Sequence, residues 1–171
     1  MDRQKCEGGL NMGKIRSCDE PVGRMAKLMA ELYYFMAREM IDKLGAEEGR
    51  KAVREAVTKF GEARAAEMKE EAAERGLEIN AETYSLVRDM PGISWEKDPG
   101  NPSDFTYCPM QDMWEQLGAN DLGSIYCEID YVLYKAFNID FERPLCKTNG
   151  DPCCRFIIKD DSGSHLKHPG L

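Results

Sequence analysis

The first third of the chain carries an apolar stripe at helical spacing. The stripe consists of Met25, Leu28, Met29, Leu32, Phe35, Met36 and Met40. Steps of three and four residues predict an α-helix with one apolar face. Ser17 or Asp19 followed by Pro21 is typical of a helix start, and Gly45 is typical of a helix end. We expect the apolar face to pack in the core, because a methionine stripe at this spacing is core far more often than pocket lining.

A second helix is expected to follow directly, over residues 46–75. Charged residues dominate it, and Gly76 is placed to end it. Its apolar positions form a narrower stripe of Val53, Val57, Phe60 and Met68. A long helix of this kind is expected to bury one side and expose the other.

Prolines and glycines separate shorter elements after Gly76. In chain order the pattern predicts a helix over 80–90 capped by Asn80, extended segments over 93–97 and 105–108, a short helix over 109–118, a helix over 121–137, and a hairpin of 141–148 with 153–159. The helix over 121–137 has a core stripe of Leu122, Ile125, Ile129, Leu133 and Phe137.

These elements predict an α+β fold, in which two long N-terminal helices and a third core helix pack on a small antiparallel β-sheet. We expect a single domain over residues 18–160. An N-terminal extension over residues 1–17 would precede it, and a flexible tail over residues 161–171 would follow.

Composition and charge narrow the class of protein. The chain is 42% apolar and 32% charged, as in ordinary globular proteins, and its net charge is −8. Clustered Lys and Arg with aromatic neighbours are missing, so we expect no nucleic-acid partner. No apolar run approaches the roughly 20 residues of a membrane span, and residues 1–15 lack the apolar core of a secretory signal. These features predict a cytoplasmic protein without a membrane partner.

The candidate chemistry is concentrated in the C-terminal half. Five of the seven cysteines lie between residues 108 and 154, in a segment without histidine. A site there must use thiol, carboxylate and phenol groups in place of imidazole. Cys127, Asp130 and Tyr134 are separated by three and four residues, so they project from one strip of the predicted helix.

Cysteine usage favours reduced thiols over a disulfide framework, since the count is odd and the spacings are unlike those of small secreted proteins. The last strand has two adjacent cysteines. Strand alternation places Cys154 on one face with Phe156 and Cys153 on the other with Arg155. If Phe156 is core, Cys154 points inward and Cys153 outward.

Three segments of the C-terminal third carry a family resemblance: FTYCP, LGSIYCEIDYVLYKAFN and NGDPCCRFII. Cys108 before a proline, Cys127 with Asp130, and Gly150 followed by Cys154-x-Phe156 resemble the L-2-amino-thiazoline-4-carboxylic acid hydrolase family. The resemblance implies hydrolysis of a cyclic amidine to a carbamoyl-cysteine. The final hairpin is also similar to small-molecule-binding domains of the 4-vinyl reductase type.

The resemblance implies a Cys/Asp site that acts on a small molecule without a cofactor. We expect Cys127 and Asp130 to be the catalytic pair, with Cys127 attacking the amidine carbon or Asp130 activating water. The expected substrate-binding residues are Cys108, Tyr134, Cys154 and Arg155. A homo-oligomer is compatible with the sequence.

Two other interpretations stay open. The chain could be a non-enzymatic small-molecule-binding or sensor domain, with Cys127 as plain core. It could also be a metal protein in which Cys108, Cys127, Cys146 and Cys154 hold zinc or an iron–sulfur cluster. The metal interpretation is weaker, because these cysteines come from separate elements without a C-x-x-C pair.

Overall fold

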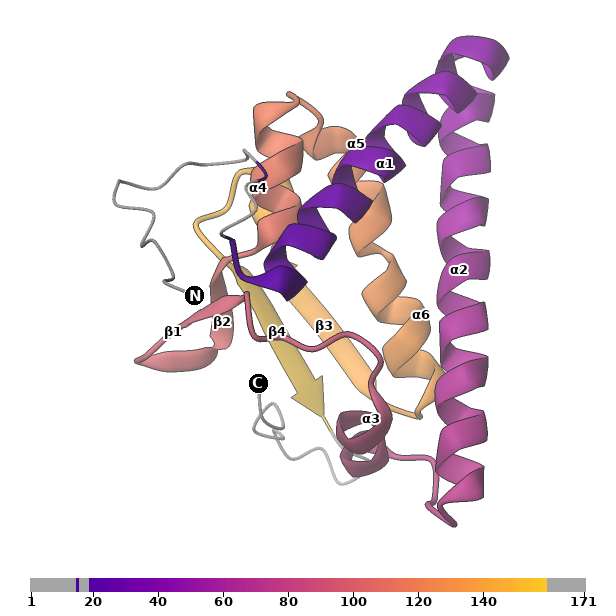
Figure 1. The fold of residues 1–171 in the computed structure, drawn as a ribbon, viewed down its shortest axis with the longest axis vertical. Helices are drawn as coiled ribbons and strands as arrows, with labels where there is room; N and C mark the ends of the chain where they lie inside the picture. The colour runs from indigo at the N-terminus through magenta and orange to yellow at the C-terminus, as the bar shows by residue number, and fades with distance from the viewer. Residues whose placement is uncertain (1–14, 16–18, 160–171) are drawn as a thin grey trace, which may run out of the picture.

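The described part of the chain comprises residue 15 and residues 19–159 of a computed structural model (Figure 1). Apart from Ile15, the predicted extension over 1–17 lies outside these residues, as does the predicted tail over 161–171. The elements are α1 (Pro21–Leu44), α2 (Ala46–Glu74), α3 (Ala81–Val87), β1 (Glu96–Asp98), β2 (Asn101–Tyr107), α4 (Pro109–Gln116), α5 (Asn120–Cys127), α6 (Ile129–Ala136), β3 (Asp140–Leu145), a 3₁₀ turn (Lys147–Asn149) and β4 (Cys154–Lys159). Within this part of the chain, every helix falls short of the length and apolar character that a bilayer crossing requires.

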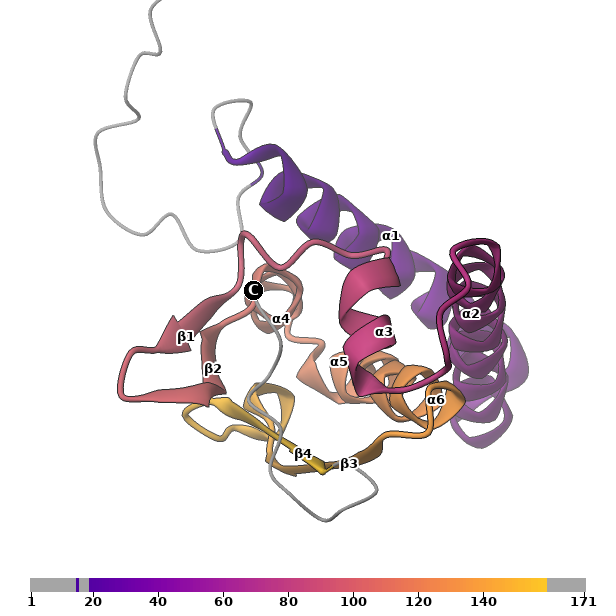
Figure 2. The ribbon, with the colours of Figure 1, turned by 90° about the horizontal axis from the view of Figure 1, so that it is seen from below.

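The predicted α+β fold is confirmed. Its four strands form an antiparallel sheet in the order β1-β2-β4-β3. Helix α6 contacts both β3 and α2, so α5 and α6 form a middle layer between the sheet and the long α1–α2 pair (Figure 2). This three-layer arrangement leaves β2 and β4 facing the middle helices, where the candidate site lies.

The turn between α1 and α2 depends on two glycines. Gly45 has a φ of +86° and donates its backbone N–H to the carbonyl of Ile41 at 2.9 Å, which ends α1 as predicted. A Cβ atom at Gly49 would lie only 2.4 Å from the Ile41 Cα atom. The two long helices can therefore be connected by one residue, Gly45, and still pack closely against each other.

The prediction that the apolar stripe of α1 lies in the core is wrong for five of its seven members, whereas Met29 and Met40 are half-buried and pack against the core. Five of its side chains are 42 to 61% exposed: Met25, Leu28, Leu32, Phe35 and Met36. The buried face carries small residues instead: Gly23, Ala26, Ala30 and Ala37. Small side chains let α1 approach α2 and α4 closely, which places the large ones on the far side of the helix. Periodicity alone does not distinguish the two faces, because both are apolar.

The inward face of α2 is also lined by small residues. Val53, Val57 and Met68 are buried as predicted, whereas the prediction for Phe60 is wrong, because this side chain is 43% exposed. Gly61 takes the inward position, where a Cβ atom would lie 3.0 Å from the Ile129 side chain and 3.1 Å from that of Val132 on α6. Close helix packing, rather than side-chain size, therefore selects the buried face.

The predicted helix over 121–137 is two helices. Helix α5 ends at Cys127 and α6 begins at Ile129, with Glu128 in a tight turn whose N–H bonds the carbonyl of Ile125 at 3.1 Å. The predicted core stripe survives this break, since all five of its members are buried: Leu122, Ile125, Ile129, Leu133 and Phe137. The break falls between Cys127 and Asp130, the two residues expected to form the catalytic pair.

A buried ion pair fixes α1 to α4. The Lys27 Nζ atom lies 3.0 Å from an Asp112 carboxylate oxygen, and the side chains are 8 and 4% exposed. Asp112 also accepts hydrogen bonds from the Tyr107 hydroxyl at 3.1 Å and the Gln116 amide at 3.2 Å. Three donors thus compensate the cost of burying this carboxylate.

Candidate active site

A cavity of about 180 Å³ lies between the middle helices and the sheet. Its lining comes from α2, α3, the segment before β1, and the elements from β2 to β4. Aromatic rings form much of the wall: Tyr84, Trp95, Phe105, Trp114, Tyr126, Tyr134 and Phe156. Such a mostly apolar hollow with a few polar groups is typical of small-molecule sites.

The structure brings the predicted acid and thiols together in this cavity. Cys127 at the end of α5 and Asp130 in the first turn of α6 both line it, on either side of the Glu128 turn. Cys108, which precedes Pro109 of α4, lines it as well, as does Cys154 at the start of β4. Among the described residues that line the cavity, Asp130 is the one carboxylate.

Asp130 is held by an arginine from the neighbouring strand. The Arg143 guanidinium of β3 lies 2.5 Å from the Asp130 carboxylate and also donates to the Cys127 carbonyl at 3.0 Å. The Arg143 side chain is 7% exposed and the Asp130 side chain 28% exposed. Arg143 therefore fixes the two ends of the Glu128 turn and leaves the carboxylate accessible from the cavity.

Burial raises the pKa of Asp130 to about 6, and the positive charges of Arg143 and Arg64 act against this rise. The desolvation of the carboxylate is therefore only partly compensated by its ion pair. A carboxyl group with this pKa is largely ionised at neutral pH and still accepts a proton more readily than an exposed aspartate.

The thiols form a hydrogen-bonded group. Cys146 lies 4.0 Å from Cys154 between sulfur atoms and 3.1 Å from the Thr148 hydroxyl, and the Lys147 N–H donates to the Cys154 sulfur at 3.3 Å. Hydrogen bonding to Cys146 and burial raise the pKa of Cys127 well above its ordinary value. The pKa of Cys146 is lowered by the hydrogen bonds from Cys127 and Cys154. The hydrogen bonds among these thiols therefore shift the pKa values of Cys127 and Cys146 in opposite directions.

The remaining thiol of the cavity is also protonated at neutral pH. Burial is the main cause that raises the pKa of Cys108. The tyrosine predicted to bind substrate, Tyr134, lines the cavity, and burial raises its pKa well above the usual range. Both side chains can donate a hydrogen bond to a bound molecule, and neither supplies a charge.

The structure places two side chains differently from the sequence prediction. Arg155 does not line the cavity; its guanidinium binds Asp104 through two hydrogen bonds of 2.7 and 2.6 Å. Cys153, predicted to point outward, is 6% exposed. Asp104 of β2 is paired with Arg155 of β4 across the sheet, and the Arg155 side chain is 40% exposed.

The sequence analysis missed two arginines of the cavity, Arg64 and Arg88. Arg64 binds Asp89 through two hydrogen bonds of 2.7 and 2.5 Å. A signal for Arg64 was present, because it lies three residues after Gly61 and four before Met68, both on the inward face of α2. Arg88 directly follows α3 and gave no such signal.

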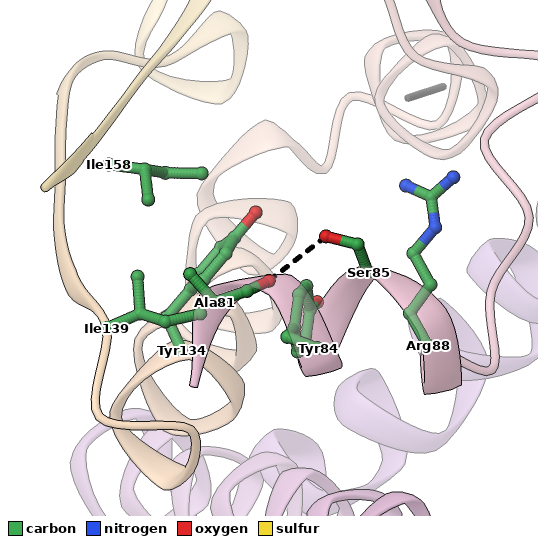
Figure 3. A pocket seen from close by; sticks show the side chains of 7 residues that line it. All are labelled: Ala81, Tyr84, Ser85, Arg88, Tyr134, Ile139 and Ile158. Atoms are coloured by element: carbon green, nitrogen blue, oxygen red, sulfur yellow. Dashed lines mark hydrogen bonds between the residues drawn. The ribbon is translucent and has the colours of Figure 1, made fainter. Parts of the chain in front are cut away.

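A second hollow adjoins the cavity and shares Tyr84, Arg88 and Tyr134 with it (Figure 3). Its volume of about 10 Å³ is room for one water molecule at most. The Ser85 hydroxyl beside it donates to the Ala81 carbonyl at 3.0 Å (Figure 3). This hollow is too small to hold a substrate.

The four-cysteine metal site is not assembled. Over residues 15 and 19–159, no three His, Cys, Asp or Glu side chains are arranged to hold a metal ion. Cys146 and Cys154 approach each other, but Cys108 comes from the β2–α4 corner and does not complete a set of ligands with them. The thiols are free cysteines in the part of the chain that the structure describes.

An α+β domain with an acid and three thiols around an aromatic cavity has the form of a protein that binds or converts a small molecule. The family model for L-2-amino-thiazoline-4-carboxylic acid hydrolase matches residues 25–158, and the chain belongs to this family. The match includes α2, α3 and every cavity residue named above, so it extends well beyond the C-terminal segments that carried the resemblance. No curated protein and no solved structure matches the chain.

Proposed function

We propose that this protein hydrolyses 2-amino-thiazoline-4-carboxylate or a closely related cyclic amidine, with Asp130 as the general base. The observation that carries the proposal is the Asp130 carboxylate, which opens into a cavity beside Cys127 and has a pKa of about 6. A base is most effective when its pKa lies near the working pH. Membership of the family supplies the substrate class.

The cavity fits a molecule of this size. A cavity of about 150 Å³ is enough to hold a benzene-sized ring, and this one measures about 180 Å³. A five-membered ring with an amino group and a carboxylate fits such a volume, whereas a peptide or nucleotide does not. Aromatic walls suit the flat face of the ring.

The charged groups match the two ends of the substrate. The Asp130 carboxylate would bind the protonated amidine, whose central carbon is electrophilic. The Arg88 guanidinium, which follows α3, would bind the ring carboxylate from another part of the cavity lining. The Arg143 guanidinium binds Asp130 and the Arg64 guanidinium binds Asp89, and these ion pairs hold the two carboxylates in place.

In the proposed reaction, Asp130 takes a proton from a water molecule while the water oxygen bonds to the ring carbon between nitrogen and sulfur. The bond from that carbon to the ring sulfur or nitrogen then breaks, and Asp130 returns its proton to the leaving heteroatom. The new hydroxyl group loses its proton to solvent and becomes the carbonyl, which balances the proton that the amidine carried. The product is the substrate plus one water, a carbamoyl-cysteine. Cys127 is less suited to attack the carbon itself, because its raised pKa keeps the thiol protonated at neutral pH.

The test is turnover by the purified protein. We expect mass spectrometry to detect a product heavier than 2-amino-thiazoline-4-carboxylate by one water, at a rate proportional to enzyme concentration. Related cyclic amidines would be compared in the same assay. Absence of product from the whole set, under conditions in which the protein is folded, would end the hydrolase proposal.

Turnover should depend on pH through Asp130. Because the ionised carboxylate is the active form and its pKa is about 6, kcat should be high above pH 7 and fall about tenfold per pH unit below about 6. The measurement is a kcat profile from pH 4.5 to 8, with the substrate's own titration determined separately. A rate that stays constant between pH 5 and 7 would show that Asp130 is not the base.

A non-enzymatic ligand-binding role is the second candidate, because aromatic rings line much of the cavity, and Asp130 and Arg64 each already have an ionic partner. Under this alternative, 2-amino-thiazoline-4-carboxylate or its product would raise the melting temperature without being converted. Stabilisation without turnover would select this role over hydrolysis.

A further inference from the structure

The outer face of α1 is unusually apolar for a surface. Met25 and Leu32 are each 61% exposed, Phe35 is 56% and Met36 is 54% exposed, and Leu28 is 42% exposed. These five residues, which we call the α1 stripe, form one continuous strip along the helix. Large apolar patches on a protein surface mark sites of interaction.

The α1 stripe lies on the side of the helix away from the core. The face that carries Ala26, Ala30 and Ala37 is buried against α2 and α4. In Figures 1 and 2, α1 runs along the outside of the molecule, across the middle helices from β3 and β4. A partner could therefore reach the stripe without moving any other described element.

The spacing within the stripe is that of a coiled-coil seam. Met25, Leu28, Leu32 and Phe35 are separated by three, four and three residues, as the a and d positions of a heptad are. Beyond them the seam becomes polar, with Glu39 and Asp42 at the next two positions. The seam is therefore short and has a defined end.

We propose that the α1 stripe pairs with the α1 stripe of a second copy of this chain, in antiparallel orientation about a two-fold axis. The spacing of three, four and three is the same in both chain directions. A two-fold axis beside the middle of the stripe therefore places Met25 opposite Phe35 of the second copy and Leu28 opposite Leu32. Every apolar position of the seam then meets another, which is the self-complementarity that a symmetric dimer requires.

The exposed apolar area of the α1 stripe is large enough to form the core of a dimer interface. The exposed parts of the five side chains amount to roughly 500 Å² per copy, against about 800 Å² per partner in a standard interface. Polar neighbours on α1, including Glu31 and Arg38, would supply the rim that surrounds an apolar interface core and add the remaining area. The Arg38–Asp42 ion pair, at 3.7 Å, is exposed and can remain at that rim.

The first test is the mass in solution. At about 50 µM, a concentration typical of light scattering on a chromatography column, we expect the full chain to have twice the 19.4 kDa mass of one copy. The Leu32→Glu variant places two carboxylates in the seam and should have the mass of one copy, with an unchanged circular dichroism spectrum. Phe60→Glu is the matched control, because Phe60 is an exposed apolar residue of α2 outside the stripe. It should remain dimeric.

The second test is the orientation. Antiparallel pairing places residue 28 opposite residue 32 of the other copy, so Leu28→Lys mixed with Leu32→Glu should give a mixed dimer more stable than either variant alone. A wild-type monomer, or a dimer that persists in Leu32→Glu, would overturn the proposal. Failure of the mixed pair to exceed the separate variants would overturn the antiparallel arrangement.

Discussion

Replacing Asp130 with asparagine is expected to lower kcat/KM for 2-amino-thiazoline-4-carboxylate by a factor of about 10² to 10⁴, the usual contribution of a general base. The asparagine side-chain oxygen can still accept the hydrogen bond from Arg143, which is 2.5 Å from Asp130 in the native protein. The fold should therefore persist while the proton acceptor is lost. Steady-state kinetics at pH 7.5, with circular dichroism on the same sample, measures both.

Two further variants test whether the loss of turnover is specific to Asp130. Arg155→Met removes a guanidinium that binds Asp104 outside the cavity, and we expect turnover to change less than about threefold. Cys127→Ser should retain most of the rate if Asp130 activates water, and should lose it if the thiol forms a covalent intermediate. An Asp130→Asn protein with full activity would remove Asp130 from the mechanism, whatever the result for Cys127.

Replacing Lys27 with methionine is expected to destabilise the protein by about 3 to 5 kcal/mol, as breaking a buried ion pair on one side does. The Asp112 carboxylate would remain 4% exposed, without the ammonium that lies 3.0 Å away. Tyr107 and Gln116 also donate hydrogen bonds to Asp112, but both of these donors are neutral. Urea denaturation followed by circular dichroism gives the free energy of unfolding.

The double variant Lys27→Met with Asp112→Leu is the matched control. Removing both charges leaves an apolar contact of similar volume, so most of the lost stability should return. A loss below about 1 kcal/mol for Lys27→Met would mean that solvent reaches Asp112. Equal losses in the single and double variants would mean that the side chains act by packing alone.

The convergence of Cys127 and Asp130 was predictable because helical spacing fixes which side chains share a face. The turn at Glu128 did not disturb this relation, since its backbone stays close to helical values. Cys154 was likewise placed by strand alternation with Phe156. Local periodicity was sufficient for these residues, whereas the same alternation placed Cys153 outward and its side chain is buried.

The errors arose where direction depends on a partner element. The α1 stripe was assigned to the core because large apolar residues outweigh alanine in any hydrophobic pattern, but close packing against α2 and α4 selects the alanine face. Arg155 was expected to bind the substrate, but its guanidinium pairs with Asp104, which is 51 residues away in the sequence. Arg143 and Asp130 are joined from different elements in the same way. Such pairings become visible only in the tertiary structure.

The most direct test of the site is a crystal structure of the wild-type protein with 2-amino-thiazole-4-carboxylate, an aromatic analogue that resists ring opening. We expect the analogue in the 180 Å³ cavity, with its amino group within hydrogen-bond distance of the Asp130 carboxylate and its carboxylate beside Arg88. Two results would contradict the assignment of this cavity as the active site. One is an analogue bound elsewhere, and the other is an analogue that does not bind at high concentration in solution or in the crystal.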